Sequence, residues 1–264
     1  MSLTDTLCWF ILGRVQARLL HMRKCEYMLP EVTYLGHRTT ADGIQPTSDK
    51  VKAVQDAPTP KNASELKSFL GLINFYGKFL PNLSTVLSPL NSLLRKGVVF
   101  RWGEQQSQAF RKVKEMLLSA DLLVHFNPDM EVTLSCDASG VGLGAVLAHR
   151  MPDGTERPIA YASRSLNKAE QNYSNIEREA LAVTFGVKKF RDYLFGCHFW
   201  LYTDHQPLMT LFNEHKPIPS EVSPRIQRWA MLLAGYTYTI RYKPGSCMTH
   251  ADALSRLPIP ATSS

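Results

Sequence analysis

The 264-residue sequence predicts an α/β protein in which a mostly helical, α+β first half precedes a mixed sheet flanked by helices. Three observations support this fold class. Apolar residues recur at helical spacing over residues 48–118, strand patterns follow one another over residues 131–163, and helix and strand patterns alternate over residues 169–243. Antiparallel strands followed by helix and strand in alternation are typical of a mixed sheet with helices on its faces.

Composition and charge indicate a globular protein with an acidic partner. Hydrophobic residues make up 44% of the chain and charged residues 20%, which excludes a disordered or fibrous protein. The formal net charge is +7, and nucleic acid is the commonest partner of a basic globular protein. Residues 1–130 carry 16 Lys and Arg against 11 Asp and Glu, a net of +5, so we expect the first half to grip phosphates.

The cysteines argue against a disulfide framework or a zinc ribbon. There are five of them, far apart and without a Cys-x-x-Cys pair. We therefore expect a reducing intracellular setting, in the cytoplasm or the nucleus. The apolar run at residues 7–12 is far shorter than the roughly 20 residues that span a bilayer, so no membrane partner is expected. Nothing in the sequence assigns an oligomeric state.

Turn and breaker residues divide the helical half. A helix over residues 1–24 is followed by a short hairpin over residues 34–44, whose turn is Ala41-Asp42-Gly43. Pro58-Thr59-Pro60 ends the next helix, and Asn62 opens the one after it. The helices predicted beyond the hairpin begin near Ser48, near Asn62, at Leu87 and at Gln105, and the last two end at Leu94 and Leu118.

The second half is rich in strands and begins near Asn127-Pro128-Asp129, where we place the domain boundary. The predicted domains are residues 1–126 and 127–258, and residues 259–264 form a disordered tail. The elements expected in the second domain are strands at 131–136, 142–150, 157–163, 198–203 and 236–243, and helices at 169–194, 205–212, 223–234 and from about 249.

Acidic residues lie close to the boundaries of three of these elements. Asp137 follows the first strand and precedes small residues, Asp204 follows the strand at 198–203, and Asp252 lies near the start of the last helix. Each has a local explanation, because Asp forms turns, caps helices and favours the positive end of a helix dipole. Singly, none of them predicts a functional site.

The long helix offers two glutamates, and helical geometry distinguishes them. Taking Ile176 as the centre of the apolar stripe, Glu179 lies about 60° from it and Glu177 about 100° away on the other side. Glu179 is therefore the one tilted toward the sheet. A carboxylate there is costly unless it has a partner, and the alternative is a partly exposed ion pair with Arg178 or Arg164.

Together, the four carboxylates predict a cation site. Two carboxylates about 4 Å apart repel by roughly 4 kcal/mol at an effective dielectric of about 20, so a cluster needs protons or cations. Divalent ions with oxygen ligands are the usual solution. A pair of Mg²⁺ ions can activate water and stabilise the leaving oxygen of a phosphodiester, as in nucleases and polymerases.

The motifs around these acids resemble the ribonuclease H domain of gypsy-type LTR retrotransposon polyproteins. The matching segments, in order, are Asp137-Ala138-Ser139, residues 173–181, Tyr202-Thr203-Asp204-His205 and residues 251–256. Upstream, Tyr34-Leu35-Gly36-His37, the helix at 66–76 and Arg101-Trp102 followed by Ala109-Phe110 resemble the end of a reverse transcriptase palm, its thumb and its connection. The resemblance covers most of the chain.

This resemblance implies a ribonuclease H-like fold and a function. Asp137, Glu179, Asp204 and Asp252 would be the catalytic, metal-binding carboxylates, holding two Mg²⁺ ions with Mn²⁺ as a substitute. The partner would be an RNA/DNA hybrid, whose RNA strand is hydrolysed to 3′-hydroxyl and 5′-phosphate ends. His250, beside Asp252, is either a helper in product release or a solvated histidine at the start of a helix.

The chain also departs from the family. Reverse transcriptases require an aromatic-x-Asp-Asp turn, and the sequence contains no Asp-Asp pair, so we expect the fingers and catalytic palm to be missing and no polymerase activity. Residues 1–24 do not match the family. Two alternatives stay open: a catalytically silent, domesticated module that binds nucleic acid or protein, and a polymerase subunit whose palm comes from a separate chain.

The glycines at 140, 142 and 144 do not form a dinucleotide-binding loop. A strand follows them, whereas a phosphate site of that kind needs the N-terminus of a helix. We expect these glycines to allow tight packing of the hairpin or the close approach of a nucleic-acid backbone.

Overall fold

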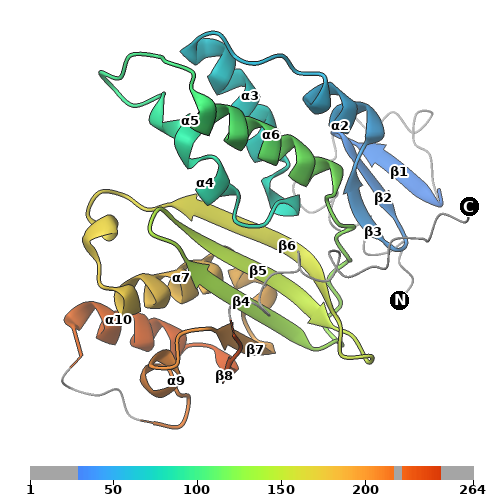
Figure 1. The fold of residues 1–264 in the computed structure, drawn as a ribbon. Helices are drawn as coiled ribbons and strands as arrows, with labels where there is room; N and C mark the ends of the chain where they lie inside the picture. The colour runs from blue at the N-terminus through green and yellow to red at the C-terminus, as the bar shows by residue number, and fades with distance from the viewer. Residues whose placement is uncertain (1–28, 217–221, 245–264) are drawn as a thin grey trace, which may run out of the picture.

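The structure, a computed structural model, describes residues 29–216 and 222–244. The predicted helix at 1–24, the last helix with His250 and Asp252, and the predicted tail lie outside these residues. No helix in the described part of the chain is both long and apolar enough to cross a bilayer. The described residues form a three-stranded sheet, a set of helices and a five-stranded sheet (Figure 1).

The five-stranded sheet is mixed, as predicted. Its strands are β4 (Val132–Ala138), β5 (Gly142–Arg150), β6 (Glu156–Ser165), β7 (His198–Thr203) and β8 (Thr237–Tyr242), in the order β6-β5-β4-β7-β8. The first three strands pair antiparallel, and β7 pairs parallel with both β4 and β8. The fold-class prediction of a mixed sheet with helices on its faces is therefore confirmed.

The prediction of a single helix at 169–194 is wrong, because the helix is interrupted twice. The segment consists of η3 (Glu170–Asn172), α7 (Asn175–Lys189) and α8 (Arg191–Leu194). Tyr173 is extended, and Ser174 begins α7 with a capping box in which Ser174 and Glu177 each accept a hydrogen bond from the other's backbone. The remaining helices of this half are α9 (Leu208–Leu211) and α10 (Pro224–Leu233).

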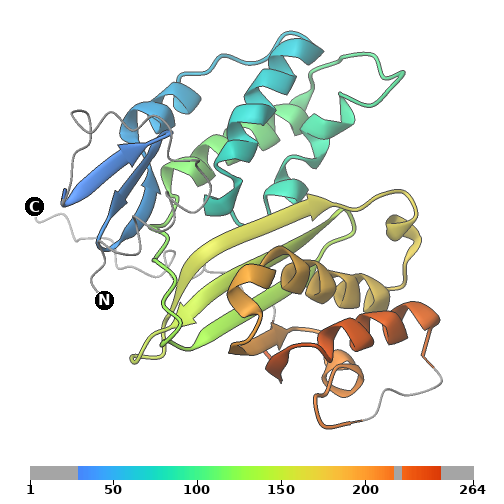
Figure 2. The ribbon, with the colours of Figure 1, turned by 180° about the vertical axis from the view of Figure 1, so that it is seen from behind.

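Helix α7 packs closely on one face of the sheet, with α10 beside it (Figure 2). Gly186 makes this close packing possible. A Cβ atom at this position would lie 2.7 Å from the Sγ of Cys136 on β4 and 3.1 Å from the Cβ of Ala145 on β5. The core between helix and sheet includes Leu134, Leu147 and Val187, all fully or almost fully buried.

The described part of the helical half contains three strands, whereas a hairpin of two strands was predicted. Its elements are β1 (Glu31–Tyr34), β2 (His37–Thr40), β3 (Gly43–Pro46), α2 (Ser48–Gln55), α3 (Ala63–Phe75), η2 (Gly77–Phe79), α4 (Leu83–Val86), α5 (Ser88–Ser92) and α6 (Glu104–Leu118). The predicted hairpin is β2–β3, and β1 adds a third antiparallel strand. The helix expected to begin at Leu87 is α5, which has Pro89 in its first turn and follows the separate α4.

The two halves share a packed boundary along β5 and β6. Helix α4 packs against both strands, and the helices of the first half lie along the β6 side of the sheet in Figure 1. Tyr161 of β6 is 4% exposed and belongs to the core of the helical half. The backbone N–H of Ser84 also donates to Ser163 Oγ across 3.0 Å. The division at residue 126 stays a prediction, because these contacts cross it.

Replacing Gly186 by Ala should destabilise the fold. Ala gains helix propensity, but its methyl group is forced against Cys136, and overpacking of a core typically costs about 1–3 kcal/mol. We expect a net loss of about 1 kcal/mol in the free energy of unfolding, measured by urea denaturation.

Gly71→Ala is the matched control. Gly71 is also inside a helix, but a Cβ atom there meets nothing within 4 Å. It should raise the free energy of unfolding by about 0.5–1 kcal/mol. Equal effects of the two substitutions would contradict the packing role of Gly186.

Candidate functional site

Three carboxylates meet at one end of the five-stranded sheet. Asp137 is near the end of β4, Asp204 directly follows β7, and Glu179 is in the first half of α7. The parallel pairing of β4 with β7 places Ser135 opposite Tyr202, two residues before each aspartate. Each of the three acids offers one carboxylate oxygen, and these oxygens all lie within 4.8 Å of one another.

Asp137 lies on a strand, and the local structure holds it there. It pairs with Gly144 across the β4–β5 ladder. The turn that follows is closed by Ser139, whose N–H donates to Gly142 O (2.8 Å) and whose Oγ accepts from Gly142 N–H (2.9 Å). Ser139 thus performs the turn-forming role that could have been assigned to Asp137, and the Asp137 carboxylate belongs to the cluster instead.

Glu179 is the buried member of the cluster. The residue is 6% exposed, and its Oε2 atom has no hydrogen-bond partner among the described residues. The structure thus places Glu179 in the cluster and Glu177 outside it, as the helical face predicts. Arg164 does not pair with Glu179, because it forms a two-pronged ion pair with Glu170 at 2.7 and 2.9 Å.

The electrostatics of the cluster favour a proton or a cation. Burial, which is the largest cause, and the charges of Asp137 and Asp204 together raise the pKa of Glu179 to about 8. Burial and the charge of Asp204 also raise the pKa of Asp137. An unpartnered buried carboxylate oxygen beside two other carboxylates is the environment that a bound cation would relieve.

The donor set fits a hard divalent ion. Carboxylate oxygens are the ligands that Mg²⁺, Mn²⁺ and Ca²⁺ prefer. Cys136 adjoins Asp137 but faces α7, and burial together with the charges of Glu179 and Asp137 raises the pKa of its thiol. It therefore stays a neutral thiol, and a soft-metal site is not formed here.

Glu177 has a structural role that helical spacing alone did not reveal. Its carboxylate accepts hydrogen bonds from Ser174 and from Ser223, and it pairs with Arg225 at 2.7 Å. The Arg225 guanidinium also stacks over the ring of Tyr173 at 3.9 Å. These contacts fasten the start of α7, and hence Glu179, to α10. The Ser-x-x-Glu spacing of a capping box was the sequence signal that could have identified the role.

A model of a known protein family matches most of the second half of the chain. The model of the RNase H-like domain found in reverse transcriptase matches residues 127–236. The transposon Tf2-3 and Tf2-4 polyproteins of Schizosaccharomyces pombe are each 36% identical to this chain over 253 residues, covering 93% of it. The chain spans 19% of the length of these relatives. The resemblance to retrotransposon polyproteins is confirmed.

Solved structures of a viral protease-reverse transcriptase share the fold. One foamy viral protease-reverse transcriptase, in complex with double-stranded DNA, is 25% identical with a TM-score of 0.67, over 84% of this chain and 39% of that one. Another, in complex with an RNA/DNA hybrid, is 24% identical with a TM-score of 0.67, over 92% of this chain and 32% of that one. The ribonuclease H-like architecture is confirmed by these matches.

The stability of the metal-free protein should change with pH because Glu179 titrates differently in the folded and unfolded states. The folded state holds a proton on Glu179 up to about pH 8, whereas an unfolded chain releases it near pH 4.5. The free energy of unfolding in EDTA should therefore fall as the pH rises from 4.5 to 8. Glu179→Gln should flatten this slope and be more stable than wild type at pH 8, measured by urea denaturation at each pH.

Glu177→Gln is the matched control in the same helix. Burial opposes ionisation of Glu177, but the hydrogen bonds from Ser174 and Ser223 and the charge of Arg225 outweigh it and lower the pKa. Its contribution to stability is present above pH 4.5 and is lost in acid, so Glu177→Gln should destabilise the protein at pH 8. A wild-type profile without the fall between pH 4.5 and 8 would contradict the raised pKa of Glu179.

Proposed function

Residues 127–236 form an RNase H-like domain of the kind found in reverse transcriptase, and from this premise we propose that the chain is a metal-dependent endonuclease. Its substrate is an RNA/DNA hybrid, of which it hydrolyses the RNA strand. The observation that carries the proposal is the cluster of Asp137, Glu179 and Asp204, with carboxylate oxygens within 4.8 Å of one another.

The three acids, together with Asp252, are proposed to hold two Mg²⁺ ions, with Mn²⁺ as a substitute. When bound, such ions lower the pKa of water and neutralise charge on a phosphodiester. Glu179 must lose its proton to act as a ligand, so ion binding is coupled to proton release. Glu177 and Arg225 keep the start of α7 in place, which fixes the position of Glu179.

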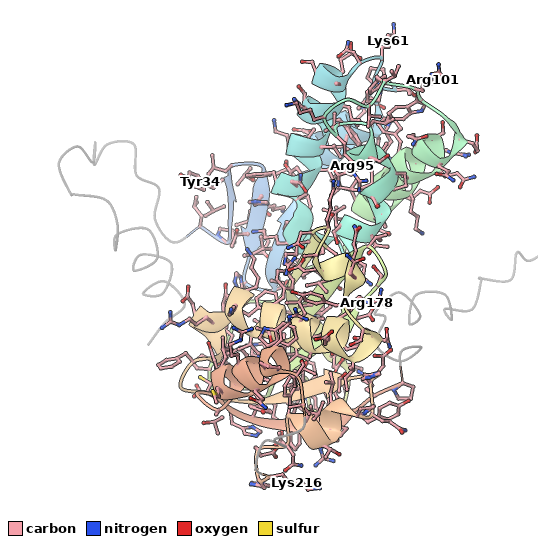
Figure 3. All side chains as sticks on the ribbon, turned by 90° about the vertical axis from the view of Figure 1, so that its left-hand side faces the viewer. Tyr34, Lys61, Arg95, Arg101, Arg178 and Lys216 are labelled. Atoms are coloured by element: carbon pink, nitrogen blue, oxygen red, sulfur yellow. The ribbon has the colours of Figure 1, made fainter. Side chains whose placement is uncertain are left out.

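The helical half is proposed to grip the hybrid through its backbone. Basic side chains extend along this half, where Figure 3 shows Lys61 and Arg101 at the far end and Arg95 nearer the sheet. A foamy viral protease-reverse transcriptase of the same fold has been solved with an RNA/DNA hybrid. Recognition through phosphates and 2′-hydroxyls predicts weak sequence preference and a strong dependence on salt.

The test is cleavage of a hybrid labelled on its RNA strand. The wild-type chain should cut it with Mg²⁺ or Mn²⁺ and not with EDTA. Asp137→Asn should reduce the rate by more than about 100-fold, because even groups that only support metal ligands typically cost about 10- to 100-fold when removed. Asp252→Asn should have the same effect if the fourth acid belongs to the site.

Asp153→Asn is the matched control. Asp153 is in the exposed turn between β5 and β6, where it accepts hydrogen bonds from Thr155, and it lies outside the cluster. It should cleave at the wild-type rate. Hybrid binding without cleavage by the wild-type chain, at any tested concentration of Mg²⁺ or Mn²⁺, would reject the nuclease in favour of a silent binding module.

A further inference from the structure

A turn of the helical half packs closely against Gly142 and Gly144, near Asp137. A Cβ atom on Gly144 would lie 2.0 Å from the Oδ1 of Asn82, and one on Gly142 would lie 2.6 Å from the Oγ of Ser84. A Cβ atom on Gly140 would meet nothing within 4 Å. Two of the three glycines therefore allow close approach, and it is a protein segment that approaches them.

The approaching segment is the N-terminal turn of α4. Asn82 is its N-cap and has a left-handed backbone, with φ of 48° and ψ of 29°. Asn tolerates this conformation better than most residues do. Thr85 Oγ1 is hydrogen-bonded to Ser139 Oγ at 3.1 Å, and Ser84 N–H donates to Ser163 Oγ. The turn therefore contacts β5, β6 and the loop that ends β4.

These contacts involve two neighbours of Asp137, its cross-strand partner Gly144 and the nearby Ser139. Gly144 is the cross-strand partner of Asp137, and the Cβ positions of residues paired in this way lie on the same face of a sheet, about 4.5–5.5 Å apart. Asn82 thus lies over the strand position opposite Asp137. Thr85 bonds Ser139, two residues beyond Asp137, whose own hydrogen bonds close the turn after β4.

We propose that Asn82 and Thr85 are positioning residues of the nuclease site, which hold the strand end that carries Asp137. The proposal rests on the proposed function for its chemistry. Since three carboxylate oxygens must be kept within 4.8 Å against their repulsion, small movements of the strand end change the fit of a cation. The helical half therefore contributes to the cation site as well as to substrate binding.

The experiment introduces a steric clash between residue 144 and Asn82 and then removes it with a second substitution. Gly144→Ala should raise the Mg²⁺ concentration for half-maximal thermal stabilisation by about tenfold and lower the cleavage rate at saturating hybrid. Adding Asn82→Gly removes the clashing side chain and keeps the left-handed backbone, so the double variant should return toward wild type. Thr85→Val, which replaces the hydroxyl by a methyl group of similar size, should shift the Mg²⁺ midpoint in the same direction.

Gly140→Ala is the control and should match wild type in both measurements. Unchanged Mg²⁺ midpoints in Gly144→Ala and Thr85→Val would overturn the proposal, including the case in which Gly144→Ala only lowers the melting temperature in EDTA. If Gly144→Ala does not fold by circular dichroism, Thr85→Val decides. A wild-type chain that is stabilised by Mg²⁺ but does not cleave would reject the proposed function, while the midpoints still test the positioning role.

Discussion

Mutual repulsion among Asp137, Glu179 and Asp204 is the constraint on which the rest of the structure depends. Folding brings their oxygens within 4.8 Å, although burial already disfavours the charge on Glu179. Such a cluster persists only if each backbone is held by contacts that do not involve the acids themselves. Strand β4 meets this need because both neighbours pair with it and its residues before Asp137 are buried.

The two glutamates of α7 show how position on a helix sets the role of a side chain. Glu177 accepts hydrogen bonds from Ser174, Ser223 and Arg225, which lower its pKa, so it contributes to stability as a charged group. Glu179 is half a turn further on and has an unpartnered oxygen and a raised pKa. Glu177, which stabilises the fold, therefore anchors the helix turn that carries Glu179, which destabilises it. Functional sites often contain such a destabilising residue, whose cost is offset by contacts elsewhere.

Local sequence patterns predicted much of the fold and part of the site. The strand at 198–203 is β7, the order of strands gave the mixed sheet, and the helical face distinguished Glu179 from Glu177. The break before α7 was missed because apolar periodicity continues through it, while only the capping box marks it. The contact between Asn82 and Gly144 joins residues 62 positions apart, and no local pattern encodes such a meeting.

The boundary between the halves is where sequence and packing differ most. The chain changes from helical to strand patterns near residue 127, yet the core of the helical half includes Tyr161 and packs against Val146. Both residues lie on the face of β5 and β6 that also carries Gly144. Removing the helices would expose this apolar face and leave the turn after β4 without its bond from Thr85. The helices thus cover one face of the sheet that carries the acids. The two halves therefore form one structural unit around the candidate site.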